Sequence, residues 1–482
     1  MRKIFIGVCI VIAKSISALS ISNAVSMDSV EFLKSHHLDF TPLSSVPRDR
    51  LKLELVEGGV TNFCFKCYDT LDSSNAIFIK HAKSKTRGFG GIELSPIRLF
   101  YEYEGMKSFA KYTPHLVPKT YYYDSEANFM ILEYFDGFFP LHDLFVTGGI
   151  DTDAAKFIGT LMGRNHAKTL INIIPNEQSN RYLNNFKNIE HFEMWERELF
   201  KPTLNLLENL KNKEIETKEN TELGLSVDEI VKKLNENNVF TNAIKSLQSI
   251  YLEKKETLVH ADLHCNNILF KIDPDSDEKI LKVIDFEKCC YGPAGLDLGV
   301  FLTNFIWFYL GHSNNTVRKN LLNQFLLTID AYRAAFIIQF DGVLKTQLKQ
   351  TKKFIKTDIT AEYIINEIIT DSIGFSALYA FFLVFTIPDV KVLDLTNVPG
   401  YKWGNPESRV LSVKRRLISL LHDLFELFLT YKDDNTDQDD KELGLGTDII
   451  GHPIGIKSTE ILQIFRKDDK MMINDHVTEF WY

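Results

Sequence analysis

Apolar and polar residues alternate at every second position in the first third of the chain, as they do in half-buried strands. Leu51–Leu55 shows this alternation most clearly. A helix is predicted at about 97–111, between the third and fourth strands. The pattern therefore predicts a strand meander with one helix, its strands lying at 51–55, 63–68, 76–80, 119–123 and 128–133.

From about residue 151 the pattern becomes helical. The polar and charged stretch 213–222 predicts a solvated loop, and two short strands at 268–272 and 280–285 flank a turn. Long apolar helices follow to about Tyr431. The apolar run 374–387 is shorter than the about 20 residues that cross a membrane, so we interpret it as a buried core helix. This order predicts an α+β protein with two lobes, an antiparallel sheet plus a helix followed by a larger, mainly helical lobe.

Composition narrows the class of protein. The chain has 482 residues, which fits two lobes that each bury a core. Its net charge of −9 argues against a general nucleic-acid binder. Five of its six cysteines lie beyond the first residues and are too scattered for a disulfide framework. Cys64 and Cys67 form a C-x-x-C in a strand-like run, and we interpret them as buried strand residues rather than as zinc or redox ligands.

The N-terminus resembles a targeting segment. Arg2 and Lys3 precede the apolar run 4–13, and small residues follow as far as Ala24. This is the pattern of a secretory-type signal, although Met27 is an alternative start. We expect residues 1–26 to be a leader or signal-like extension. The chain is then cytoplasmic if it starts at Met27, and otherwise enters the secretory pathway or an organelle.

A catalytic-loop motif gives the strongest functional signal. His260, Asp262 and Asn267 fit H-x-D-x-x-x-x-N, the loop of phosphate-transferring kinases. A carboxylate in this loop can orient the attacking hydroxyl and take its proton, and an amide oxygen five residues later can ligate Mg²⁺. We predict that Asp262 is the base, that Asn267 is a metal ligand and that His260 braces the loop.

A second motif follows the predicted hairpin. Asp285 and Glu287 stand on alternate residues after an apolar strand, in the place of the D-F-G aspartate of kinases. Two such carboxylates can face one metal cluster. We predict Asp285 as a Mg²⁺ ligand and Glu287 as a second one. A salt bridge from Glu287 to Lys288 is the alternative.

The first half supplies candidates for nucleotide binding. Gly58 and Gly59 lie in a turn between two strands that could cover the ATP phosphates, although most such turns are plain hairpins. Lys80 ends an apolar strand, where a lysine to the α- and β-phosphates would lie. Glu102 on the following helix could pair with Lys80, and Glu104 competes for that role.

The fifth strand ends at Glu133, Tyr134 and Phe135. In a two-lobed kinase this position is the hinge, so the backbone of these residues would meet adenine. ATP and Mg²⁺ are therefore the expected cofactors.

The stretch 286–304 contains Tyr291-Gly292-Pro293 and, four residues after Pro293, Asp297. It resembles the signature of the methylthioribose kinases, a family within the aminoglycoside phosphotransferase and choline kinase superfamily, and choline kinases share this signature only in part. The strand pair 57–67, which contains Asn62, looks like the family's glycine loop. The similarity implies a protein-kinase-like fold, with Asn62 at the nucleotide. Looser similarities lie at Arg98–Glu102, His115–Lys119, Tyr123–Glu126, Asp371–Phe375 and Arg409–Leu417.

The chain also departs from this family. The family's catalytic loop has glycine where Ala261 stands and serine where Asn267 stands. The segment 380–384 lacks the arginine pair that the family places on its sugar, and 88–96 replaces a tryptophan-bearing loop. The resemblance thus implies intact ATP chemistry with altered substrate recognition.

We expect an ATP-dependent phosphotransferase acting on 5-methylthioribose or a related sugar to give the 1-phosphate. A choline-, aminoglycoside- or fructosamine-type kinase, or a non-catalytic kinase-fold binding protein, are the alternatives. The expected lobes are 27–137 and 138–432, with an acidic, partly mobile tail at 433–482. The expected partners are ATP and a small alcohol or thiosugar, without nucleic acid and without an integral membrane segment in the mature chain. Whether the chain forms a homodimer does not follow from the sequence.

Overall fold

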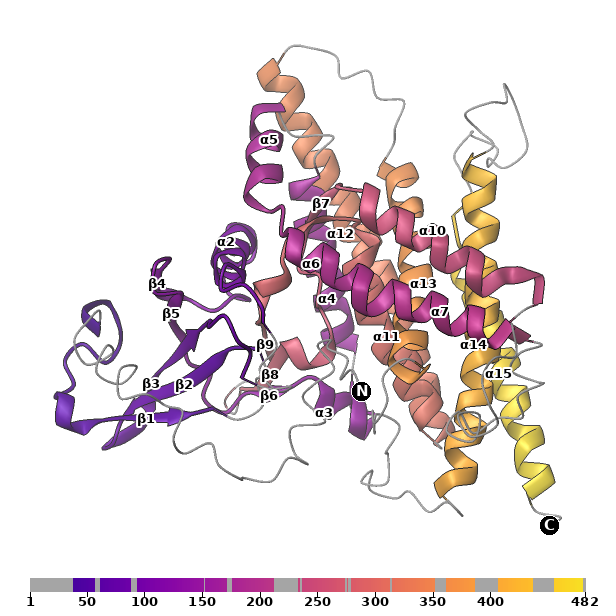
Figure 1. Ribbon diagram of the computed structural model, residues 1–482, viewed down its shortest axis with the longest axis horizontal. Helices are drawn as coiled ribbons and strands as arrows, with labels where there is room; N and C mark the ends of the chain where they lie inside the picture. The colour runs from indigo at the N-terminus through magenta and orange to yellow at the C-terminus, as the bar shows by residue number, and fades with distance from the viewer. Residues whose placement is uncertain are drawn as a thin grey trace. The chain divides into compact units, whose positions relative to one another are not determined.

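The computed structural model describes residues 38–56, 61–87, 93–150, 152–170, 176–211, 233–234, 236–273, 275, 279–312, 314–351, 361–385, 406–436 and 455–479. The predicted leader and the Gly58-Gly59 turn lie outside these ranges. The chain divides into two compact units (Figure 1). Unit 1 comprises the described residues up to Leu141 together with Asn266–Cys289, and unit 2 comprises His142–Cys265 and the residues from Cys290 onward.

Unit 1 is built on a five-stranded antiparallel sheet in the order β1-β2-β3-β5-β4. Two short 3-10 turns, Leu38–Phe40 and Arg48–Arg50, precede it. The predicted strand meander and its helix are confirmed, with differences of one to a few residues at the ends. The elements are β1 (Leu51–Leu55), β2 (Phe63–Asp69), β3 (Asp72–His81), α2 (Arg98–Ala110), β4 (Thr120–Asp124) and β5 (Phe129–Glu133).

The strands form where they do because one face of the sheet is apolar. Phe65 and Cys67 of β2 lie beside Ile77 and Ile79 of β3 and Ile131 of β5 in one buried cluster. The cysteines are free thiols. Burial raises the pKa of Cys64 to about 12 and that of Cys67 to about 11, so both stay protonated. The interpretation of this C-x-x-C as buried strand residues is confirmed.

A second, smaller sheet of unit 1 takes its strands from distant parts of the chain. It has the order β6-β8-β9, with β6 (Phe139–Pro140), β8 (Ile268–Ile272) and β9 (Lys279–Val283). The amide of Val283 also donates to the carbonyl of Leu116, 2.7 Å away. These bonds place the hairpin at 266–289 in unit 1, whereas the sequence analysis expected the whole of 138–432 in the helical lobe. The short helical turns η7 (Cys265–Asn267) and η8 (Phe286–Lys288) flank the hairpin.

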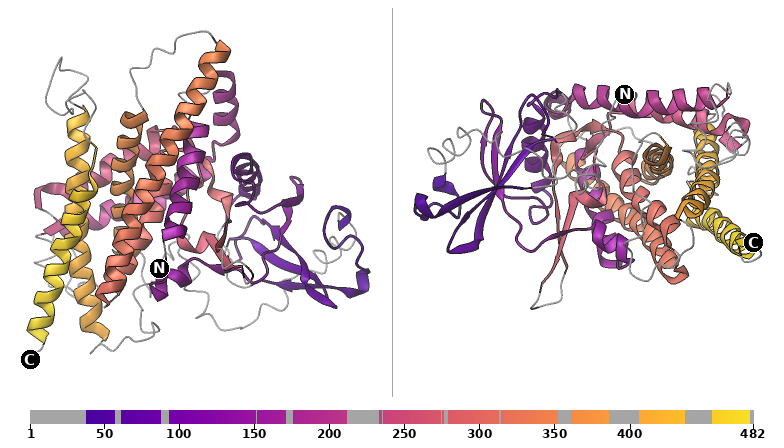
Figure 2. Two further views of the ribbon diagram at one scale, coloured as in Figure 1. Left: turned by 180° about the vertical axis from the view of Figure 1, so that it is seen from behind. Right: turned by 60° about the horizontal axis from the view of Figure 1, so that its bottom comes forward.

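Unit 2 is mainly helical, as predicted, with one strand pair, β7 (Thr257–Val259) and β10 (Cys290–Gly292). Its longest helices run side by side in Figures 1 and 2, α4 along α12, α11 along α13 and α14 along α15. The helices are α3 (His142–Thr147), α4 (Thr152–Thr169), α5 (Asn176–Asn185), α6 (Ile189–Trp195), the π-turn η5 (Glu196–Phe200), α7 (Lys201–Lys211), the short turn η6 (Glu236–Asn238), α10 (Val239–Glu253), α11 (Gly295–Gly311), α12 (Asn315–Thr351), α13 (Ala361–Phe385), α14 (Pro406–Thr436) and α15 (Ser458–Glu479).

Small residues let α4 and α12 approach closely. A Cβ atom built on Gly159 would lie 2.4 Å from the carbonyl oxygen of Thr328, and one on Gly163 would lie 2.5 Å from that of Tyr332. Any larger side chain at either position would push the helices apart. This close contact positions Tyr332 of α12, whose hydroxyl lies 2.8 Å from Nδ1 of His166 on α4.

Among the described residues, α12 is long and apolar enough over Asn315–Val343 to cross a membrane by length and composition. Just under half of its most apolar window is buried in the protein. Core helices of globular proteins meet the same criterion, and α12 packs along α4 over much of its length. The apolar segment at 374–387 was predicted to be a core helix, and its described part lies in α13 with Phe381 and Phe382 fully buried.

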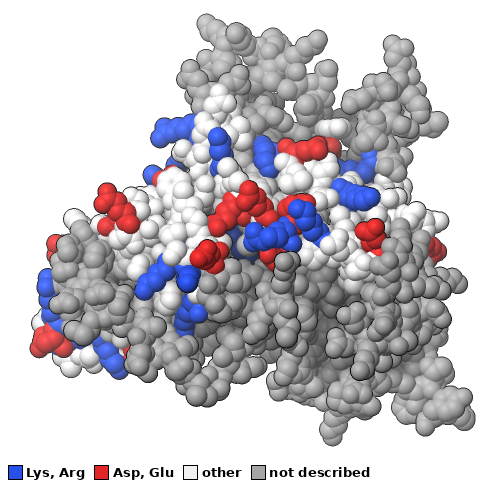
Figure 3. Space-filling view, in the orientation of Figure 1, with Lys and Arg blue, Asp and Glu red and all other residues white. Residues whose placement is uncertain are grey.

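Charged groups on the described surface are mixed in sign. On the face drawn in Figure 3, acidic and basic side chains of the described residues are interspersed.

The C-terminal region contributes to the core of unit 2. The sequence analysis placed a partly mobile tail after residue 432, but α14 continues to Thr436 and α15 packs against it. Asp468 of α15 is buried between Arg416 of α14, with Nε at 2.9 Å, and Arg318 of α12, at 3.0 Å. A buried carboxylate between two guanidinium groups ties three helices together.

We predict that Asp468→Ala lowers the free energy of unfolding by about 3–5 kcal/mol, because it leaves two buried guanidinium groups without their shared carboxylate. Arg333→Ala is the matched control, since Arg333 makes a partly exposed ion pair with Glu362 at 2.8 Å that is worth at most about 1 kcal/mol. Urea denaturation followed by circular dichroism measures both. Equal losses in the two variants would contradict the role of α15 in the core.

Candidate active site

The catalytic loop of unit 2 begins where β7 ends. Its backbone turns sharply at Ala261, which has a φ of +62°. This left-handed conformation favours glycine, the residue found here in the methylthioribose kinases. In this chain two hydrogen bonds hold the turn: the amides of His260 and Ala261 donate to the carboxylate of Asp297 at 2.8 and 2.7 Å.

Asp297 organises this loop from the first turn of α11. It is 1% exposed, and its carboxylate also lies 3.2 Å from Nε2 of His166 on α4. The other ring nitrogen of His166 is 2.8 Å from the hydroxyl of Tyr332 on α12. Sequence reasoning noted Asp297 only as part of a signature and missed this supporting role. Its position in the first turn of an apolar helix was the available signal.

Asp262 and His260 lie together in the loop. The amide of Asp262 donates to Nδ1 of His260 at 3.3 Å, and Nε2 of His264 is 3.7 Å from the Asp262 carboxylate. Both predicted residues are buried, Asp262 with 4% of its surface exposed. The contact is what a bracing histidine would make, and the catalytic role of Asp262 stays a prediction.

Unit 1 gathers the second set of predicted residues around one ammonium group. Nζ of Lys80 on β3 lies 2.7 Å from the carboxylate of Glu102 on α2 and 2.5 Å from that of Asp285. The structure therefore brings the predicted pair Lys80–Glu102 together. The competing candidate, Glu104, instead pairs with Lys107 at 3.2 Å.

Glu287 belongs to the same cluster. Its carboxylate accepts a hydrogen bond from the side-chain amide of Asn62 at 2.6 Å, and Nε of Arg98 donates to the oxygen of Asn62 at 2.9 Å. Arg98 also lies 3.7 Å from Glu287. Glu287 therefore pairs with Arg98, while the positive charge of Lys288, the alternative partner considered from sequence, also acts on it. Sequence reasoning missed the part of Arg98, which only the fold brings to Asn62.

The electrostatics of this cluster are dominated by buried carboxylates. Burial raises the pKa of Glu102 to about 7, and the charges of Asp285 and Glu287 act in the same direction, against Lys80. Burial and then Asp285 also raise the pKa of Glu287. Burial alone would lower the pKa of Lys80, but the three carboxylates hold it well above its usual value. The cluster therefore favours additional positive charge.

A divalent cation fits this donor set. Glu102, Asp285 and Glu287 each offer an oxygen, and these atoms lie within 4.8 Å of one another. Hard oxygen ligands suit Mg²⁺. The predicted ligand Asn267 is buried, and its backbone carbonyl accepts a hydrogen bond at 3.0 Å from the amide of Ile284, the residue before Asp285. Asp285, Glu287 and Asn267 would hold the ion. Glu102 would remain paired with Lys80 and would not be a ligand.

The predicted hinge residues Glu133, Tyr134 and Phe135 make contacts that do not bear on adenine binding. The amide of Glu133 donates to the carbonyl of Lys119 at 2.8 Å, so this N–H is engaged within unit 1. Lys66 lies over the ring of Tyr134 and Lys282 over that of Phe135. Adenine contact at Tyr134 and Phe135 stays a prediction, and so does phosphate contact at Gly58 and Gly59.

The candidate residues are thus divided between the units. His260 and Asp262 belong to unit 2, whereas Asn62, Lys80, Glu102, Asn267, Asp285 and Glu287 belong to unit 1. The predicted base lies in one unit, and a lysine with three carboxylates that could hold a cation lies in the other; phosphoryl transfer requires groups of both kinds.

Comparisons with known proteins agree with this chemistry. The sequence profile of the Ecdysteroid kinase-like family matches residues 99–308. A methylthioribose kinase of Bacillus thuringiensis subsp. konkukian is 27% identical over 386 residues, which cover 79% of this chain and 87% of that protein. Methylthioribose kinase 1 of Oryza sativa subsp. japonica is 25% identical over 285 residues, and the chain spans only 60% of its length.

Among solved structures, the choline kinase of Cryptosporidium parvum is 13% identical, with a TM-score of 0.40, and the alignment covers 86% of this chain and 96% of that one. The assignment rests instead on the sequence relatives and on the site. Together they define a small-molecule kinase. The chain is similar to methylthioribose kinases over 79% of its length, and its residues 99–308 match the Ecdysteroid kinase-like family.

We predict that Asp285→Ala abolishes the Mg²⁺ dependence of ATP binding and that Glu287→Ala weakens it, because each removes an oxygen ligand and a negative charge from the cation. Calorimetric titration of ATP with and without Mg²⁺ measures this dependence. Glu104→Ala is the control, since Glu104 pairs with Lys107 instead of Lys80. If Mg²⁺ has the same effect on wild type and both variants, the proposed ligands are wrong.

Proposed function

We propose that this protein transfers the γ-phosphoryl group of ATP to a hydroxyl group of a small molecule, with 5-methylthioribose or a related sugar as the first candidate. The observation that carries the proposal is the network in unit 1 in which the buried pair Lys80–Glu102 meets the half-buried Asp285. A lysine held by a helical glutamate and facing a metal-binding aspartate is the arrangement that kinases use at the phosphates of ATP. The methylthioribose kinase relatives support the same reaction.

In this reaction the acceptor oxygen forms a bond to the γ-phosphorus while the bond to the β-phosphate bridge breaks and ADP leaves. Asp262 accepts the proton of the attacking hydroxyl. Lys80 would bear on the α- and β-phosphates, and Asp297 would keep the loop of Asp262 in place through its two backbone hydrogen bonds. The bound Mg²⁺ would neutralise charge on the phosphates.

The signature around Tyr291 supports the fold more than a particular substrate. The hydroxyl of Tyr291 donates to the carbonyl of Thr169 at 3.2 Å, and Gly292 pairs with Thr257 in the β7–β10 ladder. These contacts tie β10 to β7 and to the end of α4. A sequence match at these residues therefore supports a shared fold, but it does not identify the acceptor molecule.

The acceptor is best sought among neutral molecules. The segment 380–384 lacks the arginine pair of the resembling family, and each charge-assisted hydrogen bond lost is worth about 1.5–3 kcal/mol. The apolar side chains of this segment do not offer the acceptor a contact, because Phe381, Phe382 and Leu383 are at most 3% exposed and Phe381 packs on Phe240.

A second candidate acceptor follows from the family match. The profile over residues 99–308 belongs to a family named for ecdysteroid kinases, whose named substrate is a larger, largely apolar polyol. An ecdysteroid therefore belongs in the substrate panel beside choline and an aminoglycoside. A protein that binds ATP but phosphorylates none of them would be the non-catalytic alternative.

The test compares kcat/KM for 5-methylthioribose, ribose, choline, an aminoglycoside and an ecdysteroid with the full chain. We expect turnover with a neutral polyol. We also expect kcat/KM for methylthioribose to be lower than that of the methylthioribose kinases. A clear preference for choline or the aminoglycoside would overturn the substrate class while leaving the kinase reaction in place.

We predict that Asp262→Asn lowers kcat on the best acceptor by orders of magnitude and leaves ATP affinity nearly unchanged, because the base acts on the hydroxyl group and not on the nucleotide. Asp330→Asn, at an exposed position of α12, is the matched control. Steady-state kinetics and ATP calorimetry measure the two quantities. Near wild-type turnover in Asp262→Asn would show that another group is the base.

A further inference from the structure

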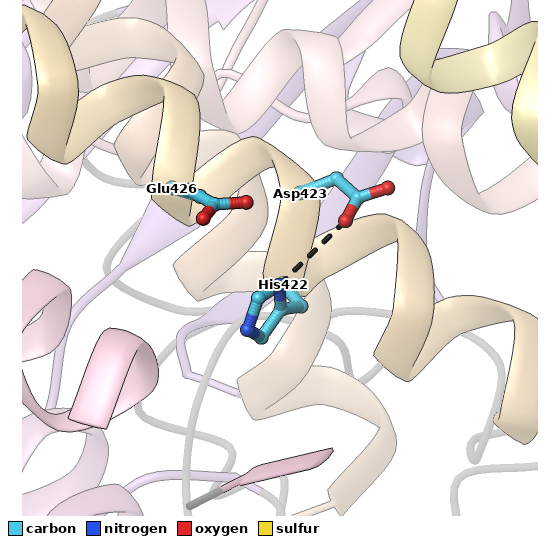
Figure 4. Close-up of side chains that lie close together, drawn as sticks. All are labelled: His422, Asp423 and Glu426. Atoms are coloured by element: carbon cyan, nitrogen blue, oxygen red, sulfur yellow. Dashed lines mark ion pairs between the residues drawn. The ribbon is translucent and has the colours of Figure 1, made fainter. Parts of the chain in front are cut away.

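A second group of metal-ligand side chains lies on α14, within unit 2. His422, Asp423 and Glu426 each offer one ligand atom, and these atoms lie within 4.8 Å of one another. Figure 4 shows the imidazole of His422 between the carboxylates of Asp423 and Glu426, with the ion pair to Asp423 dashed. His422 and Glu426 are four residues apart, so a helix places them one above the other. None of these residues takes part in the proposed phosphoryl transfer.

The imidazole of His422 is the distinctive member of the group. It is 3% exposed, and neither of its ring nitrogens has a hydrogen-bond partner among the described residues. Nδ1 lies 3.6 Å from a carboxylate oxygen of Asp423, and Nε2 lies 3.9 Å from one of Glu236 in η6. Buried imidazole nitrogens are normally paired, so a ring held between two carboxylates at these distances needs a further partner.

A metal ion satisfies these distances. Two ligand atoms bound tetrahedrally to zinc at about 2.0–2.1 Å lie about 3.3 Å apart, close to the separation of His422 Nδ1 and Asp423. Glu426 is exposed and can rotate to close the remaining gap. Glu236 faces the other ring nitrogen, where metal-bound histidines usually donate their remaining N–H to a carboxylate.

We propose that His422, Asp423 and Glu426 form a binding site for a divalent transition-metal ion, with Glu236 accepting the N–H of the His422 ring. One imidazole nitrogen and two carboxylate oxygens are a donor set that suits Zn²⁺, with a fourth position left to water. Magnesium disfavours such a site because it prefers oxygen ligands.

A lysine competes for this site. Nζ of Lys467 on α15 lies 2.7 Å from the second carboxylate oxygen of Asp423. Its side chain is 60% exposed, so it can turn into water when a cation arrives. Lys467 therefore acts as a replaceable counter-ion, and its removal raises the affinity for the metal.

The test titrates the metal-stripped full chain with Zn²⁺ in saturating Mg²⁺, which occupies the all-oxygen cluster of unit 1. We expect one Zn²⁺ per chain to bind at α14. His422→Ala and Glu426→Gln each lower this affinity about tenfold or more, and Lys467→Met raises it severalfold. With Co²⁺ in place of Zn²⁺, the visible absorption of the bound ion is lost in His422→Ala.

His142→Ala is the matched control. His142 is followed by Asp143 and approaches its carboxylate at 3.4 Å, the same dipeptide as on α14, but it belongs to no described group of three potential ligands. Its loss leaves Zn²⁺ binding unchanged. Because Glu426 and Lys467 are exposed, their variants decide the question even if His422→Ala fails to fold. Wild-type affinity in Glu426→Gln and Lys467→Met would overturn the site.

Discussion

The buried ammonium group of Lys80 is the interaction around which unit 1 is organised. A single lysine, 6% exposed, faces two carboxylates directly and a third within the same cluster. Removing these charges from water is costly, and only their mutual attraction and hydrogen bonds make it tolerable. Its three carboxylates outnumber the positive charges of Lys80 and Arg98, so the cluster favours further positive charge. The sheet, α2 and the β8–β9 hairpin must all be in place to bring its members together.

In unit 2, the buried carboxylate of Asp297 holds the catalytic loop in place. The catalytic loop turns through a left-handed residue that is not glycine, which costs backbone energy of about 1–2 kcal/mol. The carboxylate of Asp297 compensates by accepting two backbone amides, and His166 and Tyr332 fix that carboxylate in turn. The close approach of α4 and α12 at Gly159 and Gly163 brings His166 and Tyr332 together. Helix packing thereby determines the geometry of the loop that carries Asp262.

Local pattern was enough for the strands of unit 1, for α2 and for the two motifs at Asp262 and Asp285, because period and spacing are properties of neighbouring residues. It could choose Lys80 as a candidate but could not choose between Glu102 and Glu104, which required the orientation of α2 toward β3. The contacts of Arg98 with Asn62 and of Asp468 with two arginines join residues far apart in the chain. A single sequence contains no local signal for such pairs, and the docking of α15 was missed for the same reason. The burial of Phe381 and Phe382 shows a related limit, since an apolar run does not reveal whether it faces a substrate or a neighbouring helix.

The network at Lys80 is proposed to serve phosphoryl transfer to an alcohol, and phosphorus NMR of the full chain with ATP, Mg²⁺ and each acceptor measures this transfer. We expect the γ-phosphate signal of ATP to decrease as a phosphate-ester signal of one acceptor grows in equal amount, with no matching release of inorganic phosphate. If ATP stays unchanged with every acceptor, in protein that binds Mg²⁺ and ATP, the network does not serve this reaction.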